Sequence, residues 1–155
     1  MKKIISIMVL LIALNSYSQD TLSDMPKPLK DSVVGEWARY SQPAGNEILY
    51  TVTAREESKI TIKYEIFYKG NLVDQESQTV DIDSQPNLTD SKKDDCKFSK
   101  ETIEYKDEEI PCHVIEMDNI KIWTSEKIPV YGQVKITYNG VPTLELIDWG
   151  KPKQQ

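Results

Sequence analysis

Residues 120–150 read IKIWTSEKIPVYGQVKITYNGVPTLELIDWG, and this stretch decides the fold of the chain. Two runs in which apolar and polar residues alternate, 132–138 and 143–149, flank the dipeptide Asn139-Gly140. Asn-Gly between alternating runs is the strongest short-range signal for a β-hairpin, because both turn positions need positive φ angles. Pro142 has no N–H to donate and fits only the start of a strand. The stretch therefore predicts antiparallel strands joined by a tight turn at the end of the domain.

The segments upstream repeat this pattern. The clearest is 59–69, where apolar side chains stand at every second position and polar ones lie between them. A strict period of two puts the apolar set on one face of a half-buried sheet. No amphipathic helix longer than two turns is indicated. We therefore predict an all-β protein, an antiparallel curled sheet of about nine strands that forms a barrel, half-barrel or sandwich, with little helix. The other strands are expected at 33–40, 48–54, 72–82 (an edge or strongly solvated strand), 98–105, 110–117 and 120–125, and a loop is expected at 126–131.

The first eighteen residues have the composition of a secretory signal peptide. Lys2 and Lys3 precede an apolar run, and Ser16 and Ser18 supply small residues for a cleavage site. The apolar run, 4–14, is shorter than the ~20 residues that a membrane span needs. No cysteine stands near the cleavage point for lipid attachment, so a periplasmic or secreted protein is expected. The predicted organisation is a signal peptide at 1–18, a flexible lead-in at 19–32, a single β domain at 33–150 and a tail at 151–155.

Charge excludes two classes of partner. The chain has 19 Lys and Arg against 25 Asp and Glu, a net charge of −6. Cleavage removes Lys2 and Lys3, which leaves 17 basic residues against the same 25 acids, a net charge of −8. An acidic chain without a basic run repels phosphate backbones and anionic lipid surfaces. We expect neither nucleic-acid binding nor stable membrane insertion.

Cys96 and Cys112 are the only cysteines. Export to an oxidising compartment favours a disulfide between them, which would close a loop of about 16 residues and stabilise the fold by ~3 kcal/mol. A simple hairpin with its turn at 106–109 would place Cys112 opposite Thr102 or Ile103. The bridge would then require the segment before Phe98 to fold back.

The residues that usually perform catalysis are scarce. His113 is the only histidine, and in a strand it points away from Cys112, so the two cannot share a metal. Glu104 and Glu116 are the nearest candidates for a carboxylate pair, but both have the pattern of solvated strand residues. We expect a protein that is not an enzyme and holds neither metal nor cofactor.

Trp37, Tyr64 and Trp123 fall in strands at or near positions that face the core. Such aromatic side chains fill a core or line a cavity for a hydrophobic ligand. Two functions stay open at this point. One is binding of an apolar molecule or lipid in the curled sheet, with these three residues as contacts. The other is an envelope structural or protein-interaction domain with a filled core, using Phe67 and the strand at 72–82 as contact surfaces.

Several short motifs carry a resemblance. They are the G-x-W-x-x-Y start at 35–40, the strand cysteine Cys112, the W-x-S … P-x-x-G-x-V-K segment at 123–135, and the E-L-x-x-x-G end at 145–150. Together they resemble a set of uncharacterised exported bacterial β-proteins, distantly similar to the half-barrel of periplasmic lipoprotein carriers of the LolA type. The resemblance implies a curled half-barrel, and an apolar or lipidated ligand inside it.

Overall fold

The computed structural model describes residues 28–82 and 96–152, and the predicted signal peptide lies outside them. These residues form one antiparallel sheet with two short helical turns. The strands are β1 (Trp37–Gln42), β2 (Asn46–Arg55), β3 (Lys59–Tyr68), β4 (Asn71–Asp81), β5 (Cys96–Tyr105), β6 (Glu108–Met117), β7 (Ile120–Thr124), β8 (Gln133–Tyr138) and β9 (Val141–Gly150); the turns are α2 (Pro28–Asp31) and η1 (Pro43–Gly45).

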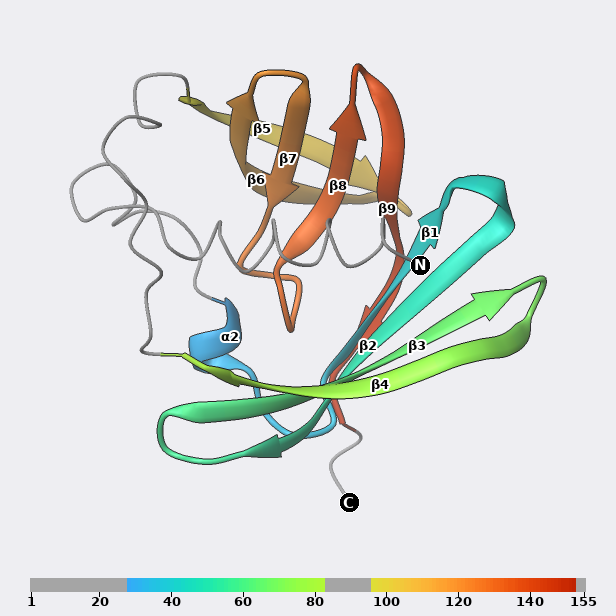
Figure 1. The fold of residues 1–155 in the computed structure, drawn as a ribbon. Coiled ribbons are helices and arrows are strands. Elements are labelled where there is room, and N and C mark those ends of the chain that lie inside the picture. The colour runs from blue at the N-terminus through green and yellow to red at the C-terminus, as the bar shows by residue number, and fades with distance from the viewer. Residues whose placement is uncertain (1–27, 83–95, 153–155) are drawn as a thin grey trace.

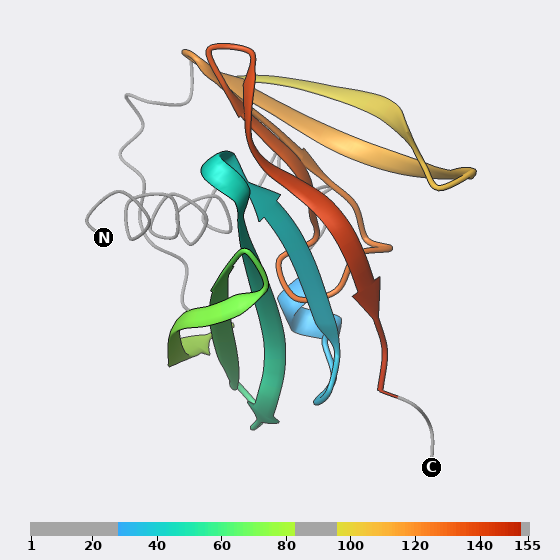
Figure 2. The same cartoon turned by 90° about the vertical axis from the view of Figure 1, so that its right-hand side faces the viewer.

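The sheet consists of two meanders joined at one seam. The order of the strands is β4-β3-β2-β1-β9-β8-β7-β6-β5. The seam is the pairing of β1 with β9: β1 to β4 lie on one side of it in chain order, and β9 to β5 lie on the other side in reverse chain order. β4 and β5 are the two edges, and the sheet curls without closing (Figures 1 and 2). The all-β prediction and the strand number are confirmed, and among the predicted shapes the open, curled sheet is the one observed.

The hairpin turns follow from local chemistry. Asn139 (φ 51°) and Gly140 (φ 75°) connect β8 to β9 directly, with Tyr138 paired to Val141. Positive φ at both central positions matches the right-handed twist of the flanking strands. The β5–β6 turn has the same form although it contains no glycine, since Lys106 and Asp107 have φ angles of 47° and 64°.

The period of two in the sequence corresponds to burial of one face of the sheet. In β3 the residues Ile60, Ile62, Tyr64 and Ile66 are buried, and the residues between them are half-exposed. Their partners on β2 continue the same face, since Ile62 pairs with Val52 and Ile66 with Ile48. This apolar inner face is the core side of the curled sheet.

The loop between β7 and β8 packs into the space that the two halves of the sheet enclose, next to α2 (Figure 1). Its residues Ile128 and Val130 are fully buried, and Leu29 of α2 is 7% exposed. The Val130 N–H donates to Ser32 Oγ at 3.2 Å, which fixes the loop against the end of α2. The Arg55 guanidinium donates to the carbonyls of three residues at α2, namely Leu29, Lys30 and Ser32, at 3.2, 2.6 and 2.6 Å. A side chain of β2 therefore holds a helix of only four residues.

The predicted disulfide is wrong. Cys112 pairs with Glu101 and Cys96 with Met117, so the two cysteines stand five residues apart along one straight hairpin. At about 3.3 Å per residue this separation is roughly 16 Å, whereas a disulfide needs Cα atoms within about 7 Å. The turn is tighter than expected, which moves Cys112 opposite Glu101 rather than Thr102 or Ile103. Cys96 and Lys97, the described residues directly before Phe98, continue as strand, and both cysteine side chains are thiols.

Candidate functional site

The three aromatic residues predicted to contact a ligand lie in different environments. The buried side chains of β1 are Ala38 and Tyr40, so Trp37 is on the other side of that strand and only half-buried. Its indole packs on Gly150, where an added Cβ would lie 2.8 Å from Trp37 Nε1. Tyr64 lies on the inner face near the β4 edge, and its hydroxyl donates to the Glu76 carboxylate.

Trp123 is buried on β7, where it ties that strand to the edge of the sheet. Its Nε1–H donates to Glu101 Oε2 at 2.7 Å, and the Lys121 ammonium lies 4.7 Å from the ring centroid. None of the three predicted aromatics lines the pocket between α2 and the β7–β8 loop or the smaller pocket between β1 and β9. The three predicted aromatic side chains therefore do not form a common site.

A different aromatic cluster fills the inner face. Tyr40 and Tyr131 each contact Tyr50 edge-on, with ring centroids 5.8 and 5.2 Å apart. The Tyr40 hydroxyl donates to the Gln133 carbonyl at 3.1 Å. Burial raises the pKa of Tyr131 to about 12 and also raises the pKa values of Tyr40 and Tyr50. All three phenols stay protonated at ordinary pH, so this cluster serves packing.

The carboxylates considered for catalysis do not form a pair. Glu104 pairs with Glu109, whereas Glu116 pairs with Lys97, and alternation along β5 and β6 puts these two pairs on opposite faces of the sheet. Within residues 28–82 and 96–152, no group of three or more His, Cys, Asp and Glu side chains is placed to hold a metal ion. The same residues contain no helix long and apolar enough to cross a membrane.

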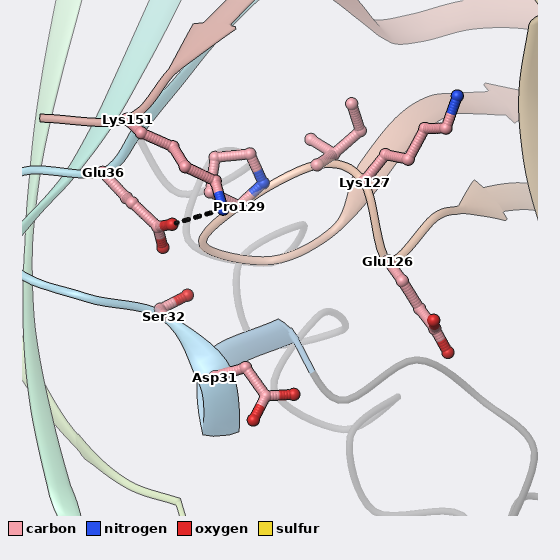
Figure 3. A pocket seen from close by; sticks show the side chains of 8 residues that line it. Asp31, Ser32, Glu36, Glu126, Lys127, Pro129 and Lys151 are labelled. Atoms are coloured by element: carbon pink, nitrogen blue, oxygen red, sulfur yellow. Dashed lines mark ion pairs between the residues drawn. The ribbon is translucent and has the colours of Figure 1, made fainter.

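One pocket brings together segments that are far apart in the sequence. It has a volume of about 330 Å³ and lies between the end of α2, the residue before β1, the loop after β7 and the residue after β9 (Figure 3). It is lined by Asp31, Ser32, Glu36, Glu126, Lys127, Ile128, Pro129 and Lys151.

Glu36 is the buried charged side chain of this pocket, with 5% of its surface exposed. Its Oε2 accepts the Val33 N–H at 3.0 Å, and its Oε1 lies 3.7 Å from Lys151 Nζ. No sequence pattern predicts this burial, because a glutamate in a G-E-W start has the pattern of an ordinary strand residue. A buried position for residue 36 depends on the β7–β8 loop, which is 90 residues away.

The β4 edge is a second candidate, and here the predicted position of the strand is confirmed. β4 pairs with β3 and, in the described part of the chain, with no other strand. Eight of its first nine residues are exposed, including Leu72 at 48% and Val73 at 57%. Phe67, expected as an exposed contact on the neighbouring strand, is instead half-buried beneath the Arg39 guanidinium, which lies 5.3 Å from the ring centroid.

These features define the protein as an all-β domain with an open, curled nine-stranded sheet, a filled inner face and two exposed edges. Comparison of the chain with protein-family models, with curated proteins and with solved structures found no match.

Proposed function

We propose that this protein is an exported, non-catalytic binding domain that recruits an extended, basic segment of another envelope protein by pairing it with β4. The observation that carries the proposal is the β4 edge: a strand of 11 residues, exposed along most of its length and paired on one side only within the described residues. An edge strand of this kind presents backbone donors and acceptors to which an extended peptide can add as a further strand.

The side chains at this edge favour a partner of defined chemistry. Tyr68, Leu72 and Val73 expose apolar surface at the β3–β4 turn, which suits apolar side chains of an incoming strand. Along β4, Asp74 and Glu76 follow, and residues 71–81 contain no Lys or Arg. Two copies of β4 would bring like charges together, whereas a strand with lysine or arginine would be attracted.

The packing of the inner face favours this function over the binding of a hydrophobic ligand. The β7–β8 loop and α2 place Ile128, Val130, Tyr131 and Leu29 in the core that the curled sheet surrounds. The pocket around Glu36 is lined largely by charged and polar residues, and a smaller pocket is lined by residues of β1 and β9 with Pro43. Binding of an apolar ligand by Trp37, Tyr64 and Trp123 stays a prediction, and solvent extraction of protein purified from the periplasm, followed by mass spectrometry, tests it.

The proposal is tested with nine-residue peptides in which valine alternates with lysine, and with matched peptides in which glutamate replaces lysine. We expect the lysine peptides to bind the mature chain and the glutamate peptides not to bind. Asp74→Lys should weaken binding of the lysine peptides by about tenfold, equivalent to ~1.4 kcal/mol.

Glu104→Lys is the matched control, since it makes the same change of charge on the opposite edge strand, β5, and should leave the affinity unchanged. Equal weakening by both variants would show that net charge alone attracts the peptide. Absence of binding, or undiminished binding to the Asp74→Lys variant, would contradict the assignment of β4.

A further inference from the structure

The pocket around Glu36 is separate from the β4 edge, and its charges are incompletely compensated. Burial of a carboxylate is costly unless hydrogen bonds and opposite charges replace its water. Glu36 Oε2 has a backbone donor, Val33 N–H, at 3.0 Å. Glu36 Oε1 has a lysine at 3.7 Å, which is beyond hydrogen-bond distance.

The lysine near Glu36 is weakly held. The Lys151 side chain is 79% exposed, whereas the Glu36 side chain is 6% exposed, so an ordered carboxylate faces a solvated ammonium. An exposed ion pair contributes little, because the lysine loses side-chain entropy when it is held and is well hydrated when it is not. A competing cation that fits the pocket can therefore displace it.

The other charges of the pocket leave an excess of negative charge. Asp31 and Glu126 add two carboxylates to its lining. Lys127 is directed elsewhere, since its Nζ donates to Glu108 Oε1 at 2.9 Å and to the Glu109 carbonyl at 3.0 Å. In Figure 3 its ammonium points away from the Glu36 carboxylate. Once Lys151 moves, no cation is directed at Glu36. The exposed carboxylates of Asp31 and Glu126 also point away from Glu36 in Figure 3, so they add negative charge at the rim of the pocket, and Glu36 is the acceptor within it.

The geometry selects an organic cation over a metal ion. Ca²⁺ and Mg²⁺ require several oxygen ligands around one point, and no such group is present among the described residues. An ammonium or guanidinium group needs only a few acceptors around its N–H donors. A volume of about 330 Å³ lies at the lower end of the range for ligand pockets, which fits a small molecule.

We propose that this pocket binds a small organic cation with a primary ammonium or guanidinium group, which takes the place of Lys151 at Glu36 Oε1. Glu36 supplies the buried charge, and the loop residues Ile128 and Pro129 line the pocket beside it.

The test uses calorimetric titration of the mature chain with cadaverine and agmatine, with 1-pentanol as a neutral compound of similar length. N-acetyl-lysine amide, added in a separate titration, distinguishes a free amine from a lysine side chain as the natural source. We expect both amines to bind and pentanol not to bind.

Two variants separate a binding site from a structural ion pair. Lys151→Met removes the internal competitor and should tighten cadaverine binding by about threefold to tenfold. Glu36→Gln keeps an acceptor for Val33 N–H but removes the charge, and should weaken binding by at least tenfold, while Glu104→Gln, outside the pocket, should have no effect.

The proposal is overturned if neither amine binds the native chain or the Lys151→Met variant at millimolar concentration. It is also overturned if Glu36→Gln, shown by circular dichroism to be folded, binds as the native chain does. These results leave the β4 proposal untouched, because the peptides used there are measured on a different surface.

Discussion

Tyr131→Phe should stabilise the protein, an unusual direction for a substitution in a core. The Tyr131 hydroxyl is buried and has no hydrogen-bond partner among the described residues. An unsatisfied buried hydroxyl costs roughly 1–3 kcal/mol, and phenylalanine removes this cost while it keeps the ring that contacts Tyr50. We take about 1 kcal/mol as the expected gain, since loss of the oxygen leaves a small void.

Tyr40→Phe is the matched control, because it makes the same chemical change in the same cluster. The Tyr40 hydroxyl does have a partner, the Gln133 carbonyl at 3.1 Å, and phenylalanine would remove that buried hydrogen bond. We expect a loss of about 1–2 kcal/mol from this variant.

Urea unfolding of the chain without residues 1–18 measures both changes. For a slope of about 1.5 kcal/mol/M, a gain of 1 kcal/mol raises the midpoint by about 0.7 M with the slope unchanged. The two variants should therefore move the midpoint in opposite directions. A loss of stability in Tyr131→Phe as large as that in Tyr40→Phe would refute the claim that the Tyr131 hydroxyl is buried without a partner.

Three further predictions concern packing, pH and the thiols. Gly150→Ala should destabilise the fold by about 1–3 kcal/mol in urea unfolding, because the new Cβ would lie 2.8 Å from Trp37 Nε1. An unchanged urea midpoint would mean that the Trp37 indole moves aside at no cost in free energy. Hydrogen bonds from Lys121 and Trp123 lower the pKa of Glu101 in the folded protein. The ionised Glu101 carboxylate therefore contributes its full stabilisation above the ordinary carboxyl pKa of 4.5, and this stabilisation is lost as the pH falls through the lowered pKa of the folded state. The stability difference between the native chain and Glu101→Gln should shrink over that acidic range, and a difference that is constant from pH 7 to pH 2 would contradict this. In denaturant, the unreduced protein should take up two alkylating groups, one at Cys96 and one at Cys112. In the native state, Cys112 should react slowly because burial raises the pKa of its thiol to about 11. If the denatured protein takes up no alkylating group, the two cysteines form a disulfide.

The strands can be predicted from the sequence because the patterns that indicate them are local. Alternation in 59–69 and the Asn139-Gly140 turn depend on neighbouring residues alone, and both appear in the structure as predicted. The polar composition of 72–82 likewise indicates an edge strand, and β4 is one of the two edges. Whether the sheet closes depends instead on pairing between the two edges, for which no local pattern exists.

The candidate sites were harder to predict because they depend on contacts between distant segments. Glu36 becomes buried only because the β7–β8 loop and the residues after β9 reach it. Trp37 was expected near the core, yet the alternation in β1 buries Ala38 and Tyr40 instead. The disulfide prediction failed since oxidising surroundings favour a bond only where geometry brings the thiols together, and the β5–β6 register keeps Cys96 and Cys112 apart.

The central claim is that β4 receives a partner strand, and amide hydrogen exchange of the chain without residues 1–18 tests it most directly. In the absence of peptide, amides of β4 that do not donate to β3 should exchange rapidly, since they face solvent at the sheet edge. With the valine–lysine peptide at saturation, these amides should become protected while those of the opposite edge, β5, do not change. Protection confined to β5, or no change at β4 while the peptide is bound, would contradict the account.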